Sequence, residues 1–295
     1  MNILLRLSVF FCVCAMLSTT SAQGTAPADG AEEYLLRFIF TEGEILRYRT
    51  EQRVTHKAVA PAGVKVDLST VKQTRMFRVG EVSDQGQAQV SMQFERVRME
   101  LKSDDQPTEV FDTSMKDSEV PVKFRTAARN LKKPAPTFVL RADGTPVSDE
   151  GVEQIPKGGQ ASFMMPLPRK PIAVGETWKV TMQSKVRIAE GVMRTISALR
   201  TYRLQEMQGD IATITFATSI TSKVRSPAIK ALLLQATPKG TILFNVKHGR
   251  VLEREITFAR SVMGAVGPNS LVSVKGRTTE TLLSHAETPT AVSAR

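Results

Sequence analysis

The chain has 295 residues, of which 41% are hydrophobic and 6% aromatic, and its formal net charge is +11. This length suffices for one large domain or two small ones, and the excess of bases suits anionic partners such as envelope polymers, lipid head groups or nucleic acid. Both cysteines, Cys12 and Cys14, lie in the first apolar run, so a chain cleaved after that run has no disulfide, thiolate metal site or cysteine nucleophile.

Residues 1–22 have the features of a cleaved secretion signal. Arg6 provides a basic start, residues 7–17 form an apolar run, and Thr20 and Ala22 are the small residues expected before a cleavage site. The run is shorter than the roughly 20 residues that span a bilayer as a helix. We therefore expect an exported protein, periplasmic or secreted, that is cut near Ala22 and has no transmembrane segment in its mature chain.

Residues 33–40 (EYLLRFIF) predict an opening strand, and the next segment predicts a strand that recurs later in the chain. Residues 43–54 (GEILRYRTEQRV) align with residues 175–186 (GETWKVTMQSKV). Successive side chains of a strand point to opposite faces, so each stretch should have one buried and one exposed face. The buried set places Leu46 at the position of Trp178, the only tryptophan, which predicts that Trp178 belongs to the core.

The alignment continues into a hairpin, a short helix and a second hairpin in each half. Residues 70–101 and 197–224 predict hairpins that turn at Gly86 and Gly209. The second hairpins turn at Asp143-Gly144 and His248-Gly249. Between the hairpins, apolar residues at helical spacing predict an amphipathic helix in each half: Phe124, Ala127, Ala128 and Leu131 in the first, and Ile229, Leu232, Leu233 and Ala236 in the second.

These elements predict a mainly β (α+β) fold: two related halves of curved antiparallel sheet, each with one short amphipathic helix. Residues 103–119 are expected to form an acidic loop, and residues 270–283 a closing strand. Whether the halves share one sheet stays open, because a strand could cross between them at residues 160–174. The chain divides into a signal (1–22), a disordered tail (23–32), a first β-rich half (33–159), a Pro-rich junction (160–174), a second β-rich half (175–285) and a disordered tail (286–295).

Three segments carry a resemblance to a known kind of protein. The chain opens with LRFIFTEGEILRYRTEQ, repeats as IAVGETWKV and continues with TILFNVKHGRVLERE. This pattern resembles a family of secreted bacterial β-rich proteins of unknown function. The resemblance covers most of the mature chain, and it implies neither an activity nor catalytic residues.

The sequence contains no motif that predicts catalysis, cofactor binding or a metal site. His56, His248 and His285 lack the spacing of zinc ligands, and no nucleophile elbow, phosphate-binding loop or dinucleotide fingerprint is present. The acidic candidates Asp104-Asp105, Asp149-Glu150, Glu44 and Glu176 lie in polar loops or beside turn glycines, without the apolar pocket that tunes a catalytic carboxyl. We therefore assign no catalytic, cofactor-binding or metal-binding residue, and we expect a protein that is not an enzyme.

Three functions remain as hypotheses. The first is a non-catalytic exported protein that binds an apolar or lipid-like ligand in a curved sheet. The second is an envelope interaction or structural protein that uses its basic surface on anionic polymers, although the basic run 123–133 follows the acidic residues 104–119. The third is a hydrolase with an unrecognised site. Binding to nucleic acid is not expected, because aromatic residues are few and do not interleave with the basic run.

Overall fold

The structure is a computed structural model that describes residues 32–104, 106–133, 137–147, 165–189 and 192–284. The expected signal at 1–22 and the expected tail at 286–295 lie outside these residues. None of the described helices is both long and apolar enough to cross a membrane.

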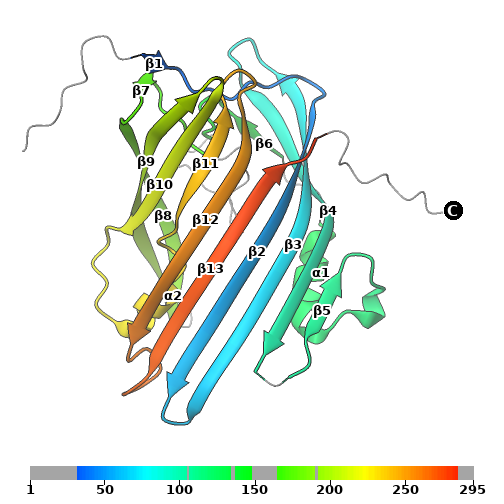
Figure 1. Ribbon diagram of the computed structural model, residues 1–295. Helices are drawn as coiled ribbons and strands as arrows, with labels where there is room; N and C mark the ends of the chain where they lie inside the picture. Colours follow the sequence, from blue (N-terminus) through cyan, green and yellow to red (C-terminus); the bar gives the residue numbers. More distant parts are fainter. Residues whose placement is uncertain (1–31, 105, 134–136, 148–164, 190–191, 285–295) are drawn as a thin grey trace, which may run out of the picture. The chain divides into compact units, whose positions relative to one another are not determined.

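Most of the described chain is antiparallel sheet (Figure 1). Strands β1 (Glu33–Tyr34) and β7 (Ile172–Ala173) pair with each other, and the other described strands form one large sheet in the order β5-β4-β3-β2-β13-β12-β11-β10-β9-β8, with β6 also paired to β4. The strands of the large sheet are β2 (Ile45–Ala60), β3 (Gly63–Val82), β4 (Ala88–Ser103), β5 (Glu109–Asp112), β6 (Thr137–Leu140), β8 (Thr177–Ala189), β9 (Val192–Gln208), β10 (Ile211–Ile220), β11 (Lys239–Asn245), β12 (Arg250–Met263) and β13 (Leu271–Leu282).

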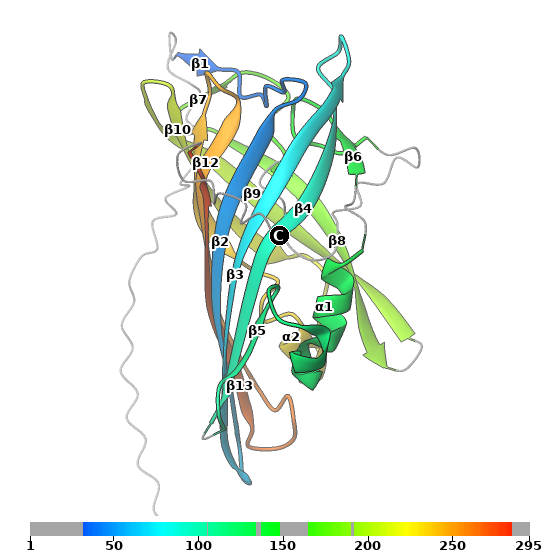
Figure 2. The same cartoon turned by 90° about the vertical axis from the view of Figure 1, so that its right-hand side faces the viewer.

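Two short helices accompany the sheet, as the sequence predicts. Helix α1 spans Arg125–Leu131, after the 3-10 turns η1 (Asp117–Glu119) and η2 (Val122–Phe124), and helix α2 spans Pro227–Leu232. Figure 2 shows α1 and α2 on the same side of the curved sheet, its concave side. The mainly β, antiparallel fold class is therefore confirmed.

The two predicted halves share one sheet, joined by β13 and β2. These strands pair in antiparallel register from Val59 opposite Leu271 to Tyr48 opposite Leu282. A strand that crosses between the halves at residues 160–174 had also been possible from the sequence. The described part of that segment contributes only the two residues of β7 to a sheet, while Met165 and Leu167 are buried.

The two Gly-Glu stretches begin their strands with the same backbone hydrogen bonds. Gly43 donates to the carbonyl of Val79 at 3.0 Å, and Val79 donates to the carbonyl of Glu44 at 2.9 Å. In the second half, the equivalent bonds join Gly175 and Glu176 to Leu204 at 2.7 and 3.1 Å. Both glycines have positive φ, 79° and 92°, which explains why glycine occupies the turn.

The opening strand expected at 33–40 forms only at Glu33–Tyr34, so this prediction was too long. The segment then crosses the ends of two hairpins instead of lying beside a strand. The Phe38 amide donates to the carbonyl of Ala142 at 2.7 Å, and the Ile39 amide donates to that of Gly249 at 3.2 Å. Its hydrogen bonds therefore go to turns, which sequence periodicity does not reveal.

The segment expected as an acidic loop contains a strand. Within residues 103–119, β5 pairs with β4, and Phe111 is buried against Phe124 and Ala128 of the first helical region. One apolar residue among acidic ones is therefore enough to attach the segment to the core. The second helix is also shorter than its apolar stripe, since α2 ends at Leu232 and the stripe continues to Ala236.

Candidate functional site

The concave face is filled with side chains at the end of the sheet nearest β1. This core combines residues of both halves with the crossing segment around Leu36 and Phe38 and with Met165 and Leu167. Its largest fully buried aromatic side chains are Tyr48, Phe77 and Phe244. The β1 end of the concavity is thus a packed core of the kind that stabilises the fold.

A buried ionic cluster lies on the same face, where β13 meets its neighbours. Glu280 of β13 is ion-paired with Arg75 of β3 and, at 3.3 Å, with Arg254 of β12. Thr50 of β2 accepts a hydrogen bond from Arg75 at 3.0 Å and donates to Glu280 at 3.3 Å. Burial lowers the pKa of Arg75, which the charge of Glu280 opposes, and burial also raises the pKa of Tyr48 nearby. The cluster connects four strands and is shielded from solvent, so its role is structural.

The concave face has an apolar hollow of about 280 Å³ beside α2, called the α2 hollow from here on. Its apolar lining comes from the end of β10, the segment around α2, and β12. The lining side chains are Ile220, Val224, Leu233, Leu234 and Val262, together with the polar Thr237 and the exposed Lys230 and Arg260. This part of the concavity therefore has room beside its core.

The local sequence explains where helix α2 begins and which side of it is held. Pro227 occupies the first turn of the helix, and the hydroxyl of Ser226 accepts from the Ile229 amide at 3.5 Å, which fixes the start. After the helix, Leu234 packs against Phe258 in a small core that closes this end of the sheet. The helix is therefore held at its C-terminal side, and the hollow remains between it and the sheet.

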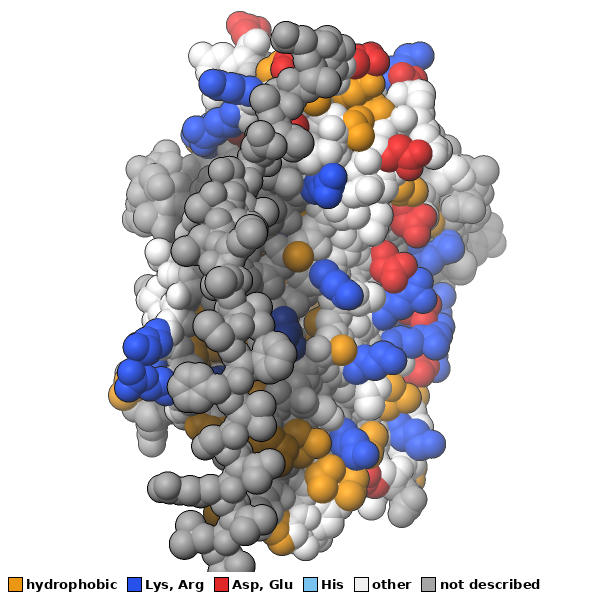
Figure 3. Space-filling view, turned by 60° about the vertical axis from the view of Figure 1, so that its left-hand side comes forward, with side chains coloured by type: hydrophobic (Ala, Val, Ile, Leu, Met, Phe, Trp, Pro, Cys, Tyr) orange, Lys and Arg blue, Asp and Glu red, His pale blue; other side chains and the backbone are white. Residues whose placement is uncertain are grey.

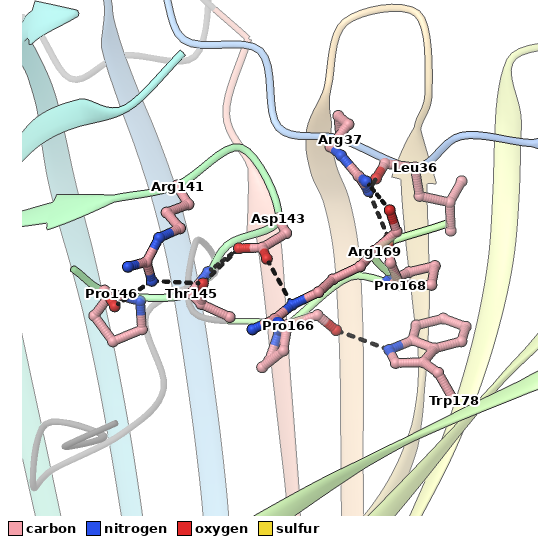
Figure 4. Close-up of polar contacts among 10 residues, drawn as sticks. All are labelled: Leu36, Arg37, Arg141, Asp143, Thr145, Pro146, Pro166, Pro168, Arg169 and Trp178. Carbon is pink, nitrogen blue, oxygen red and sulfur yellow. Dashed lines mark hydrogen bonds and ion pairs between the residues drawn. The ribbon is translucent and has the colours of Figure 1, made fainter. Parts of the chain in front are cut away.

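Trp178 lies beside a second hollow, of about 400 Å³, next to the segment 165–170 (Figure 4). Its indole nitrogen donates to the carbonyl of Pro166 at 2.9 Å, and its ring stacks on Tyr202 at 5.1 Å between centroids. The side chain is half-buried and packs against the main core. Trp178 thus serves as a core residue, although it is less buried than the sequence suggested.

Several polar groups beside this second hollow bond to one another. Arg37 donates to the carbonyls of Pro168 and Arg169, each at 2.5 Å, and Asp143 accepts from the Thr145 amide at 3.0 Å. Figure 4 shows Asp143 and Arg169 directed toward each other, with 3.7 Å between their charged atoms. These contacts fasten the segment 165–170 to the sheet, and so this hollow is a poor candidate for ligand binding.

Three of the carboxylates considered from the sequence have structural partners. Glu44 is paired with Arg250 at 2.6 Å, and Glu176 accepts from the Ala173 amide at 2.9 Å. Asp104 has a φ of 41° and accepts from the Val66 amide at 2.7 Å, as a turn residue does. Asp105, Asp149 and Glu150 lie outside the described residues.

The two described histidines, His56 and His248, lie in different elements. His248 lies in the turn between β11 and β12, where its amide donates to the side chain of Asn245 at 2.8 Å. His56 is 3.4 Å from the side-chain nitrogen of Gln235, and His285 lies outside the described part of the chain. Within the described part, no three His, Cys, Asp or Glu side chains gather where they could hold a metal ion.

Basic and acidic side chains offset each other over much of the surface. Two ion pairs join the acidic segment 103–119 to the basic run 123–133. Lys123 pairs with Glu109 at 2.5 Å, and Lys132 pairs with Asp117 at 2.6 Å. Over the right-hand part of Figure 3, side chains of both signs are intermixed. The sequence-level excess of bases therefore does not form one uniform patch on this side.

Comparison with known proteins gives a family match over part of the chain. Residues 157–251 match a family described as a family of unknown function, DUF6263. A solved structure titled "Structure of DynF from the Dynemicin Biosynthesis Pathway of Micromonospora chersina" aligns over 88% of this chain and 90% of that chain, with 8% identity and a TM-score of 0.22. A TM-score this low does not show that the two proteins share a fold. No curated protein matches the chain.

Proposed function

We propose that this protein is an exported, non-catalytic binding protein that takes an apolar or lipid-like ligand into the α2 hollow. The observation that carries the proposal is the contrast between the two ends of the concave face. At the β1 end, the hollow beside Trp178 is bordered by the polar contacts that fasten the segment 165–170, whereas the α2 hollow retains about 280 Å³ beside apolar side chains. This volume is at the lower limit of small-molecule sites, about 300–1,000 Å³, and it suits one short chain or the end of a longer one.

Filling the α2 hollow should weaken binding. Val262 is half-buried in the hollow, while Val266 is 63% exposed in the turn between β12 and β13. We expect Val262→Trp to weaken binding of a dansyl-labelled undecanoic acid at least about tenfold, and Val266→Trp to leave it unchanged. The measurement is the probe's fluorescence titration. Absence of binding by the wild type, or equal affinity of Val262→Trp, would refute the proposal.

Export is the second part of the proposal and rests on the sequence of residues 1–22. Fractionation of a cell that expresses the full chain tests it. We expect the mature protein outside the cytoplasm, with an N-terminus at Gln23. An uncleaved chain in the cytoplasm would contradict this part without affecting the binding site.

The related halves belong to the proposal as a duplication within one chain. The matching hydrogen bonds of Gly43-Glu44 and Gly175-Glu176 support it. Superposing β2, β3, β4 and β6 on β8, β9, β10 and β11 in an experimental structure tests it. A common register through all four strands is expected, and a shifted register in any of them would argue against duplication.

A second candidate function is the binding of an anionic polymer. One feature of the convex face supports it. A shallow hollow of about 570 Å³ lies across β2, β13 and β12, with Lys57 and Lys275 beside small side chains such as Ser273. We expect the protein to be retained on heparin and its retention to fall steeply as the salt concentration rises. The double variant Lys57→Gln/Lys275→Gln should be retained more weakly. Retention that ignores salt would count against this function.

A further inference from the structure

We propose that the α2 hollow selects amphiphiles with an anionic head, an acyl chain joined to a carboxylate or phosphate, and that Lys230 and Arg260 bind that head. This inference rests on the proposed function and deepens it. The proposed occupant is a single dispersed amphiphile molecule and not a membrane surface.

The charge of the surrounding chain is the first reason. Residues 220–237, which run from the end of β10 through α2 to Thr237 and line one side of the hollow, contain no Asp or Glu. The bases in the same span are Lys223, Arg225 and Lys230. An anion near an apolar wall interacts with such charges more strongly than it would in bulk water.

The placement of the two cations is the second reason. Lys230 comes from α2 and Arg260 from β12, so they reach the hollow from the helix and from the sheet. The Arg260 Nε donates to the Thr237 hydroxyl at 3.0 Å, which fixes one edge of the guanidinium while its other nitrogens remain able to donate. Within the described ranges, neither cation has a carboxylate at ion-pair distance.

The apolar lining is the third reason, because it separates this site from an ordinary basic surface. Leu233 and Leu234 are buried, and Val224 and Val262 are half-buried, so a chain entering the hollow meets hydrocarbon on both sides. Two exposed cations beside such a wall are complementary to a molecule with one charged end and one apolar end. A small polar anion would leave the apolar wall in water.

The test compares three ligands with the same chain: dodecanoate, dodecyl phosphate and neutral dodecanol. Isothermal titration is done with the full mature protein, the variant Lys230→Gln/Arg260→Gln, and the charge-matched control Lys72→Gln/Arg78→Gln, at two exposed positions of β3. We expect both anions to bind the wild type about tenfold more tightly than dodecanol. The first variant should bind the anions only as tightly as dodecanol, and the control should behave as the wild type.

The outcomes separate this inference from the proposed function. If no ligand binds, the proposed function fails. If dodecanol and dodecanoate bind the wild type equally, selection by the head is refuted while binding in the hollow stands. Equal loss of all three ligands in the first variant would assign Lys230 and Arg260 a structural role and overturn the inference. Binding to anionic phospholipid vesicles without binding of dispersed dodecanoate would overturn it in favour of a membrane surface.

Discussion

At the scale of single residues, Glu280 is the side chain on which the interior depends most. It is 1% exposed and neutralises buried guanidinium groups from two strands. Removing one partner of a buried ion pair leaves an uncompensated charge, which costs about 3–5 kcal/mol. We therefore expect Glu280→Gln to lower the free energy of unfolding by about that amount, measured by urea denaturation.

A surface ion pair provides the matched control for that change. Glu255 is 38% exposed and pairs with Arg277 at 2.8 Å, on the outer face of neighbouring strands. Exposed pairs contribute about 0–1 kcal/mol, so Glu255→Gln should scarcely change the unfolding free energy. If the two variants had equal effects, the buried cluster would not have the importance assigned to it.

Asp112 at the end of β5 gives the fold a dependence on pH. Burial alone would raise its pKa, but the amide and hydroxyl of Ser114, at 3.1 and 2.8 Å, and the charge of Arg96 lower it below its ordinary value. Because the folded pKa is the lower one, ionised Asp112 stabilises the fold above the unfolded value of about 3.9. That contribution is lost as the pH falls through the folded pKa.

The prediction concerns the difference between the wild type and Asp112→Asn. Urea unfolding should show the wild type more stable at pH 7, and the difference should shrink below about pH 4. Asp117→Asn is the control, since Asp117 is 76% exposed and forms a surface ion pair with Lys132. A difference for Asp112→Asn that stays constant from pH 7 to pH 2 would contradict this assignment.

At the scale of elements, the turn between β11 and β12 is constrained by the segment that crosses it. Gly249 has a φ of 60°, and a Cβ there would lie 2.2 Å from the Ile39 amide nitrogen. Gly264 has a similar φ of 71° with nothing within 4 Å. Backbone strain of about 1–2 kcal/mol applies to Ala at either position, but the steric clash applies only at Gly249.

We expect Gly249→Ala to lower the melting temperature clearly more than Gly264→Ala does. Thermal unfolding of both variants measures this difference. The crossing segment should also loosen in Gly249→Ala, seen as faster amide hydrogen exchange at Ile39. Equal effects of the two substitutions would mean that the contact with residues 36–40 does not hold this turn.

The elements themselves were largely predictable, because alternation and turn glycines are local signals. Leu46 and Trp178 lie on strands as their alternation predicts, and Gly144 and Gly249 occupy the expected turns with positive φ. Local signals do not show what crosses a turn. The segment at 35–40 has the composition of a strand, yet it is bonded to hairpin ends that lie more than a hundred residues further along the chain.

At the scale of the whole sheet, the decisive contacts join residues that are far apart in sequence. The pairing of β13 with β2 makes one sheet of the two halves, and Arg75 and Glu280 meet only because of it. The α2 hollow likewise needs β10, α2 and β12 together. Composition and periodicity could suggest a curved sheet that binds an apolar ligand, but not where along its concave face an apolar hollow lies.

The most direct test of the central claim is an NMR measurement of contacts between the protein and ¹³C-labelled dodecanoate. We expect nuclear Overhauser effects from the ligand's chain to methyl groups of Val224, Leu233 and Val262 in the α2 hollow. Overhauser effects to side chains around Trp178 instead would contradict binding in the α2 hollow. A bound ligand that shows no such effects to the hollow's methyl groups would contradict it as well.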